Sequence, residues 1–456
     1  MDPDFPEIPE KRKFRDSVLF KMLVIGVLIL ALGIPLMMVR AQIHERQQRR
    51  ASVVNEVAST WGRAQILGGP VLTVPYLVHD KDEKGKVTTW AQFAHFLPET
   101  LKVDGRLEPE LRRRGIFEVA VYRADLQVSG SFLRPNLTGM GIPPQDVLWD
   151  SASLSIGIPD MRGLRSNVRL VWGSKVLQLS PGGGVTGLWS TGLRVPIAGL
   201  AQAPEKQAYP FAFALSVRGS QELSFLPFGK QTSVTLRSSW PDPSFSGGFL
   251  PESRSVTSKG FEAAWSVPYF GRSYPQQWLA AERESMAPET SVQESAFGVE
   301  LYLPVDVYQK TERSVKYGML FLVLTFLAFF LFEAFSPVSL HPMHYLLVGS
   351  ALCLFYVLLL SISEHIPFAA AYGIASAGIL VLISGYSLAI LRGKRRALGM
   401  SGMLVILYGY LYVLLQAEDY ALLLGSLGLF VILALVMFLT RRVDWYSTRM
   451  EKATAP

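Results

Sequence analysis

The chain has little cysteine and little charge. Cys353 is the single cysteine among 456 residues, which excludes an intramolecular disulfide and a metal site built from several cysteines. Asp, Glu, Lys and Arg together make up only 18% of the chain, and 50% of its residues are hydrophobic. That balance is too apolar for an ordinary soluble protein of this length. We therefore expect a membrane protein in which Cys353 is a small buried residue.

Long apolar runs are absent from most of the chain and occur only at 18–39 and over 317–440. A hydrocarbon core of about 30 Å needs about 20 helical residues. The first run, VLFKMLVIGVLILALGIPLMMV, meets that length and exceeds the usual ~7–15 apolar residues of a cleaved signal peptide. We predict an uncleaved N-terminal anchor and keep a cleaved signal peptide as the alternative.

The C-terminal apolar region divides into five further runs separated by very short loops, which predicts helices that run up and down as hairpins. The five predicted helices cover about 317–335, 343–362, 368–391, 400–416 and 420–440. No run has an ionisable residue clearly at its centre, which argues against an ion pump, because a pump must bind its ion halfway across. Small residues such as Gly373, Gly378 and Gly385 predict close approach of helices and a tightly packed bundle rather than a pore.

The net charge is +7, and the basic residues cluster beside the apolar runs, as KRKFR, RGKRR and RRVDW. A nucleic-acid binder more often shows a basic face with stacking aromatics, so no nucleic-acid partner is predicted. Lys and Arg in short segments mark the cytoplasmic side of a membrane. This rule places 1–17 and 441–456 in the cytoplasm and 40–316 outside it. The lipid bilayer is the first predicted partner.

The segment 40–316 has a different pattern. Its start, AQIHERQQRRASVVNEVASTWG, has helical composition and predicts an extension of the first helix. Short stretches with alternating apolar residues then follow, as in GIFEVAVYRA, and Gly, Pro, Asp and Ser separate them. Many strands at such spacing predict a large antiparallel β-sandwich. The fold class is therefore α+β membrane protein, with six transmembrane helices and a β-rich domain between the first and second.

Polar residues interrupt the apolar stretch AFFLFEAFSPVSLHPMHYLLV. Glu333 lies 16 residues after Tyr317, about 24 Å into a span of about 30 Å, so it is predicted near the cytoplasmic boundary. His341 and His344 are three residues apart, and two such imidazoles with Glu333 as a third ligand would suit zinc. The stretch is therefore either an interfacial turn or a metal or proton site. A metal-dependent hydrolase here is the minor enzymatic alternative.

Candidate chemistry in the β-rich segment is sparse. Asp160 and Arg162, in IPDMRGL, form either a functional corner or an ion-paired loop. Trp240 and Phe245, in SSWPDPSFSGGFLP, belong to an aromatic–proline segment that either binds a partner or plugs one end of the sandwich. No catalytic triad can be assembled, so we predict no enzyme, no catalytic residue and no cofactor.

Several segments in order along the chain carry a resemblance: GGPVLTVP, HFLPETLKVDG, RRRGIFEVAVY, SSWPDPSFSGGFLP, GFEAAWSVPYFGR, PVDVYQKTERSVKYGMLF and MFLTRRVDWY. The chain resembles the CreD family of bacterial inner-membrane cell-envelope integrity proteins from about residue 15 to about 447. The resemblance implies the inner membrane of a Gram-negative cell, a periplasmic domain, and a role in the envelope stress response and in tolerance of wall-active agents. It implies no catalytic residue or ligand.

These observations predict a non-enzymatic inner-membrane protein that supports envelope integrity. Its periplasmic β domain would bind an envelope protein, lipid or glycan while the helices anchor it. The alternative is a transporter or lipid-handling protein that uses a polar path among the helices.

Overall fold

The computed structural model describes residues 18–81, 86–185, 188–201, 207–280, 289–303, 307–335, 340–391, 393–417 and 420–441. The chain divides into two compact units. We call residues 1–49 with 305–456 the helical unit, and residues 50–304 the β domain. The predicted cytoplasmic N-terminus, almost all of the predicted C-terminal tail and the turn at 336–339 lie outside the described residues.

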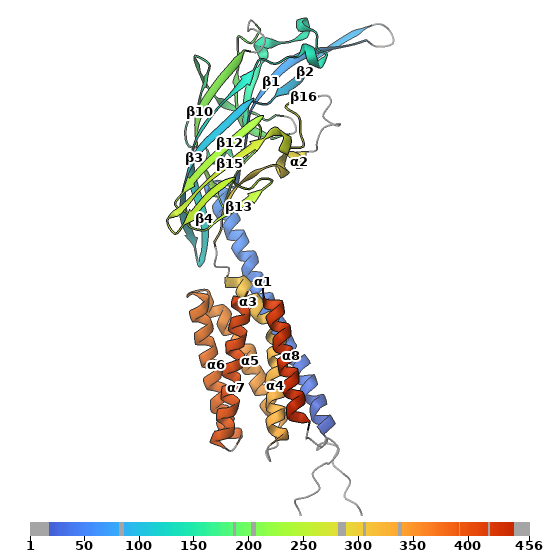
Figure 1. Cartoon of the computed structure of the whole chain (residues 1–456), viewed down its shortest axis with the longest axis vertical. Coiled ribbons are helices and arrows are strands. Elements are labelled where there is room, and N and C mark those ends of the chain that lie inside the picture. Colours follow the sequence, from blue (N-terminus) through green and yellow to red (C-terminus); the bar gives the residue numbers. More distant parts are fainter. Residues whose placement is uncertain are drawn as a thin grey trace, which may run out of the picture. The chain divides into compact units, whose positions relative to one another are not determined.

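The helices of the structure are labelled in Figure 1. They are α1 (Val18–Trp61), α2 (Glu289–Glu294), α3 (Val307–Lys316), α4 (Gly318–Ala334), α5 (Pro342–Ser363), α6 (Phe368–Ile390), α7 (Lys394–Gln416) and α8 (Ala421–Thr440). Helix α1 has 44 residues and continues through the polar segment to Trp61, as its composition predicts. Helix α7 begins six residues before the predicted boundary at 400, because lysine and arginine are good helix formers and do not end a helix.

Five helices among the described residues are long and apolar enough to cross a membrane: α1, α5, α6, α7 and α8. Helices α3 and α4 meet at a bend of 43° and provide a sixth span if the pair is counted as one. By itself α4 has 17 residues, close to the predicted helix at 317–335. The predicted class of an α+β membrane protein with a central β domain is confirmed.

Close helix packing in the helical unit occurs at Gly349 of α5. A Cβ added there would lie 2.2 Å from Leu32 of α1 and 2.8 Å from Phe326 of α4. A Cβ at Gly373, Gly378 or Gly385 would meet nothing within 4 Å among the described residues. The prediction that these three α6 glycines mediate close helix approach was therefore wrong. Spacing along a helix does not show which neighbour a small residue meets.

The β domain contains two sheets. Their strands are β1 (Gln65–Lys81), β2 (Val87–Phe96), β3 (Thr100–Arg114), β4 (Phe117–Leu133), β5 (Ser153–Gly157), β6 (Arg169–Trp172), β7 (Lys175–Gln178), β8 (Ser180–Gly183), β9 (Thr191–Pro196), β10 (Ala208–Ser220), β11 (Glu222–Phe225), β12 (Gln231–Ser238), β13 (Pro243–Gly247), β14 (Ser253–Thr257), β15 (Gly260–Pro268), β16 (Gln277–Leu279) and β17 (Phe297–Leu301). The nine-stranded sheet runs β13-β17-β11-β1-β5-β9-β8, with β2 and then β16 attached to β1. The eight-stranded sheet runs β14-β15-β12-β3-β4-β10-β6-β7 (Figure 1).

One hydrophobic core joins the inner faces of the two sheets, so the domain is a sandwich. In β10, Phe211, Phe213, Leu215 and Val217 are buried and the side chains between them are more exposed, as expected for a strand with one face in the core. The prediction of an antiparallel sandwich was wrong for two pairs, because β1 pairs with β11 and β3 with β12 in parallel. Alternation within a strand shows its buried face but not the direction of its neighbour.

Candidate functional site

Glu333, near the end of α4, is the centre of a polar cluster in the helical unit. Its carboxylate bonds to the ammonium group of Lys21 in α1 and accepts from the hydroxyl of Tyr345 in α5 at 3.2 Å. It also accepts from the backbone N–H of Leu340 at 3.2 Å. The Glu333 side chain is only 11% exposed, so a charge that would be costly alone is compensated by these three donors. The cluster joins three helices.

His341 and His344 bond elsewhere. The Nδ1 atom of His341 accepts from the backbone N–H of Met343 at 3.2 Å and caps the start of α5. The Nδ1 atom of His344 lies 2.8 Å from the hydroxyl of Tyr386 in α6. Across the described ranges, no group of three or more His, Cys, Asp or Glu residues could hold a metal ion. The two imidazoles therefore bond to the start of α5 and to α6 rather than to each other.

Lys21 is the residue of this cluster that sequence reasoning missed. It lies inside the first apolar run, in VLFKMLV, close to the predicted start of the first helix at residue 18. The signal was available, because ionisable residues inside membrane segments usually pair with one another. Lys21 and Glu333 were the lysine and the carboxylate predicted near the same membrane boundary.

A second polar cluster lies at the other end of α5. Glu364, whose side chain is 9% exposed, accepts from the hydroxyl of Tyr308 at 3.2 Å and pairs with Arg46 at 3.4 Å. A cleft of about 200 Å³ adjoins this pair, and both apolar and polar side chains line it. It is lined by Val39, Gln42, Arg46, Val357, Leu360, Ser361 and Glu364.

Asp160 and Arg162 form an ion-paired loop in the β domain. The guanidinium of Arg162 donates to both carboxylate oxygens of Asp160, at 2.9 and 3.0 Å. The backbone N–H groups of Arg63 and Arg162 donate to the same carboxylate at 3.1 and 3.2 Å. Burial alone raises the pKa of Asp160, but these hydrogen bonds outweigh burial and hold the pKa below its ordinary value. This geometry fits an ion-paired loop rather than a functional corner.

The Asp160→Asn substitution is expected to lower the free energy of unfolding of the β domain by about 1–3 kcal/mol at neutral pH. The folded-state pKa is depressed, so the ionised carboxylate stabilises the domain above the unfolded pKa of about 3.9. This contribution is lost as the pH falls through the folded pKa. Thermal melts from pH 7 towards pH 2 should therefore show wild type and variant converging. The exposed Asp150→Asn serves as control, and a gap that stays constant across this range would contradict the assignment.

Trp240 and Phe245 serve the packing of the β domain. Trp240 is 8% exposed, and its indole N–H donates to the backbone oxygens of Asp242 and Tyr302, each at 3.1 Å. Phe245 packs edge-on against Phe261 and Trp265, with ring centroids 5.6 and 5.8 Å apart. This arrangement fits an aromatic–proline segment that closes one end of the sandwich rather than one that binds a partner.

A set of arginines around Trp61 is a feature that sequence reasoning did not find. Arg112 and Arg218 stack on the Trp61 ring, 4.2 and 4.1 Å from its centroid. Burial lowers the pKa of Arg218, and the positive charges of Arg165, Arg123 and Arg112 lower it further. We call Arg112, Arg123, Arg165 and Arg218 the arginine cluster. Its members are dispersed along the chain, so no local motif announces it.

Comparison with known proteins agrees with this architecture. The family model described as Inner membrane protein CreD matches residues 17–446. The Inner membrane protein CreD of Escherichia coli (strain K12) is 35% identical over 447 residues, which cover 97% of this chain and 96% of that protein. With its N-terminal apolar helix, its C-terminal apolar helices and its central β domain, the chain belongs to the CreD family of inner membrane proteins.

Proposed function

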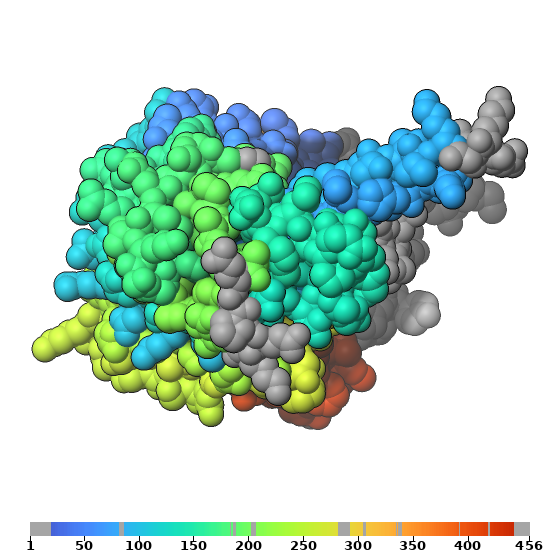
Figure 2. Space-filling model, turned by 90° about the horizontal axis from the view of Figure 1, so that it is seen from above, coloured from blue at the N-terminus to red at the C-terminus, as the bar shows by residue number. Residues whose placement is uncertain are grey.

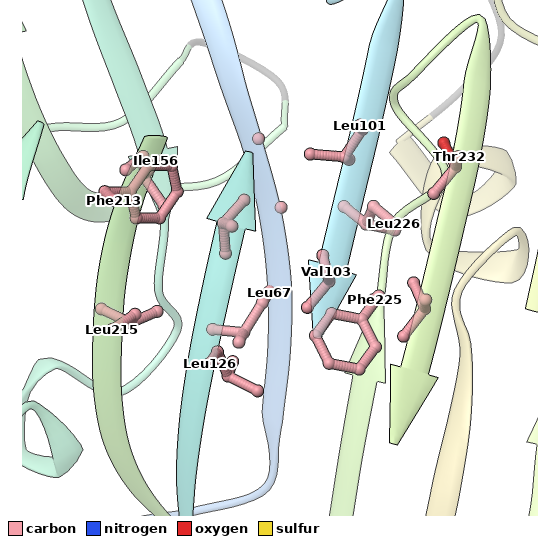
Figure 3. A pocket seen from close by; sticks show the side chains of 14 residues that line it. Leu67, Leu101, Val103, Leu126, Ile156, Phe213, Leu215, Phe225, Leu226 and Thr232 are labelled. Atoms are coloured by element: carbon pink, nitrogen blue, oxygen red, sulfur yellow. The ribbon is translucent and has the colours of Figure 1, made fainter. Parts of the chain in front are cut away.

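We propose that this chain is a non-enzymatic inner-membrane protein that supports envelope integrity, with the helical unit as anchor and the β domain as a binding module. The interior of the sandwich carries this proposal. The cavity between its sheets has a volume of about 20 Å³ (Figure 3). That is room for about one water molecule, whereas pockets for small ligands usually measure about 300–1,000 Å³. A partner would therefore bind on the surface of the domain.

The lining of this cavity supports the same conclusion. Leu67, Leu126 and Phe213 are among the apolar side chains that surround it in Figure 3. Thr232 is the one hydroxyl side chain in the lining, and its oxygen already bonds to the backbone N–H and oxygen of Gly229, at 2.9 and 3.3 Å. The lining thus offers no unpaired side-chain group to a substrate.

The hairpin of β1 and β2 offers a surface for binding. Its outer part stands out from the rest of the β domain as a light-blue projection in Figure 2. Val87 and Phe93 on one face of β2 are 52% and 40% exposed, and Trp90 on the other face is 39% exposed. Exposed apolar side chains gathered on one element mark interaction sites. We assign the docking of an envelope protein or lipid to this hairpin, with the β domain in the periplasm and both termini in the cytoplasm, as the Lys and Arg distribution favours.

The experiment is complementation in a Gram-negative strain that lacks its own CreD-family protein. The triple variant Val87→Ser, Trp90→Ser and Phe93→Ser should lose at least about tenfold of the survival that wild type confers in a wall-active antibiotic, because polar replacements remove the apolar contact. Phe270→Ser is the matched control, because Phe270 is 82% exposed outside the hairpin. Full protection by the triple variant at normal protein level would contradict the proposal.

The placement of the β domain is checked in the same cells. Thr88 is exposed on β2, and Cys353 is buried, so Thr88→Cys introduces an accessible thiol. A membrane-impermeant maleimide applied to intact spheroplasts should label this variant and leave the parent protein unlabelled. Labelling only after the membrane is permeabilised would place the β domain in the cytoplasm and contradict the proposed topology.

The cleft beside Glu364 and Arg46 favours a second candidate function, lipid handling. Its lining contains both apolar and polar side chains, as a lipid chain and its headgroup would require. Filling it with Gln42→Leu and Ser361→Leu separates the two functions in the same survival assay. If the protein handles lipid, the double variant should lose protection against the antibiotic. If the helical unit is only an anchor, the double variant should protect as well as wild type.

A further inference from the structure

The arginine cluster lies on the outer face of the eight-stranded sheet. Arg218 of β10 stands directly opposite Arg123 of β4 in the antiparallel register. Like charges directly opposite one another destabilise a strand pair. Arg165 adds a third charge, since its backbone N–H donates to the oxygen of Ser216, two residues before Arg218, at 3.0 Å. The fold thus gathers three guanidinium groups that repel one another.

The carboxylates on this face form no salt bridge with the three arginines. Glu108 pairs with Arg106 at 3.6 Å, and Glu110 pairs with Arg112 at 3.0 Å. Asp125 lies two residues from Arg123 and opposite Ser216. Within the part of the chain that the structure describes, no salt bridge joins a carboxylate to the side chains of Arg123, Arg165 or Arg218. Glu108 stands opposite Arg123 in the register of β3 and β4, and the charge of Glu110 acts on Arg218, so nearby carboxylates offset the three charges only in part.

The surroundings hold the cluster in place. Trp61 is the last residue of α1, and its indole N–H donates to the backbone oxygen of Tyr122 at 3.3 Å, next to Arg123. Cation–π contact with this fixed ring restrains Arg112 and Arg218. The Nε atom of Arg218 is buried and has no hydrogen-bond partner within the described chain, so the protein compensates this charge incompletely. Such a preorganised group loses little conformational entropy on binding an anion.

We propose that Arg123, Arg165 and Arg218 form a binding site for a phosphate oxyanion. Guanidinium groups match phosphate in geometry and bind it through paired N–H donors. A phosphate carrying more than one negative charge would relieve the repulsion between Arg123 and Arg218. The inference rests on the proposed binding role of the β domain and adds to the β1–β2 hairpin a second contact, with a phosphate as its ligand. Both a lipid headgroup and a soluble phosphate carry this chemistry.

The position of the site within the domain is consistent with such a role. Helix α1 ends at Trp61, and β17 ends at Leu301, whose N–H donates to the oxygen of Gln221 at 2.7 Å. Gln221 is three residues from Arg218. The end of α1 and the end of β17 therefore both lie close to the cluster.

The test is calorimetric titration of the purified full chain, in an uncharged detergent at low salt, with sodium pyrophosphate as the probe. Wild type should bind it saturably below about 1 mM. Replacing Arg123 and Arg165 by Gln should weaken binding about tenfold for each residue, the usual effect of losing a charge-assisted hydrogen bond. Arg237→Gln is the matched control, because Arg237 lies on the same sheet and is already paired with Asp104 and Glu262.

A second titration separates the two sources of phosphate. Dihexanoyl phosphatidylglycerol tests the lipid headgroup, with dihexanoyl glycerol as the probe that lacks phosphate. Binding of the phosphatidylglycerol alone, or of pyrophosphate alone, supports the site and identifies its source. Binding of neither probe, or equal binding by wild type and the double variant, overturns the proposal. A variant with Lys at both positions should retain part of the affinity, which shows that the loss in the Gln variant is not caused by misfolding.

The titration tests the oxyanion site, and the survival assay tests the proposed function, so a negative result in one leaves the other claim standing. If the purified chain binds neither probe but still protects cells, the oxyanion site is wrong and the binding role of the β domain stands. If these arginines bind pyrophosphate but the chain confers no protection, the site stands and the proposed function is wrong.

Discussion

Phe297→Ala is expected to lower the free energy of unfolding of the β domain by about 3–5 kcal/mol. Phe297 is fully buried in β17 of the nine-stranded sheet. Its ring lies 5.9 Å from that of Trp265 in the eight-stranded sheet and 6.4 Å from that of Phe225. The side chain therefore joins the two sheets. Truncation would leave a cavity at their interface, because neighbours held in two different sheets cannot close the gap.

Tryptophan fluorescence of the full chain measures this effect, since every tryptophan except Trp445 belongs to the β domain. In a domain of this size each 1 kcal/mol shifts the thermal midpoint by about 2–4 °C, so we expect a fall of about 10 °C. Phe270→Ala is the matched control, because Phe270 is 82% exposed and its loss should change stability by less than about 0.5 kcal/mol. Equal midpoints for the two variants would show that Phe297 does not hold the sheets together.

Gly349→Leu is expected to separate α1 from α5 in the helical unit. A Cβ at Gly349 already overlaps Leu32 at 2.2 Å and Phe326 at 2.8 Å, so a full leucine side chain has no room. Overpacking of this kind costs about 1–3 kcal/mol. The expected fall in the thermal midpoint of the helical unit is about 5 °C, by the same proportionality. The effect should be confined to the helices, because every contact concerned lies among them.

Cys353 makes this change measurable. It is the single cysteine, lies one turn after Gly349 on α5, and its thiol lies 3.7 Å from the backbone oxygen of Leu32 in α1. A fluorogenic thiol reagent therefore reports the opening of this interface on heating. Gly373→Leu in α6 is the matched control, since a Cβ added there would meet nothing within 4 Å among the described residues and helix propensity changes equally. An unchanged midpoint for Gly349→Leu would mean that α1 does not pack on α5 as described.

The sequence already predicted the position of Glu333 in its helix but not its partners. Its distance from the start of the run, at about 1.5 Å per residue, predicted the end of a span, and the residue lies near the end of α4. Lys21 is 312 residues away along the chain, so no local pattern joins the two. The same spacing suggested a metal ligand set with His341 and His344. Those imidazoles bond instead to the start of α5 and to Tyr386, which only the packing of α5 and α6 could decide.

The aromatic–proline segment shows the same limit. Composition predicted a rigid element at 238–251 and left two roles open, partner binding or plug. Burial of Trp240 and the edge-on packing of Phe245 on Trp265 depend on β13 joining β17 and on the opposing sheet. Neither neighbour can be inferred from the segment itself.

Apolar length, the positions of Lys and Arg, and the alternation of strands determined by themselves that this chain is a membrane protein with a central β domain. These signals are local. The length of an apolar helix must match the thickness of the lipid bilayer, and a half-buried strand must alternate apolar and polar side chains. Tertiary structure alone decided the parallel strand pairs, the Lys21–Glu333 pair and the arginine cluster around Trp61. Each of these features depends on which segments, far apart in the sequence, meet in the fold. Contacts of this kind produce no periodic pattern of residues from which they could be predicted.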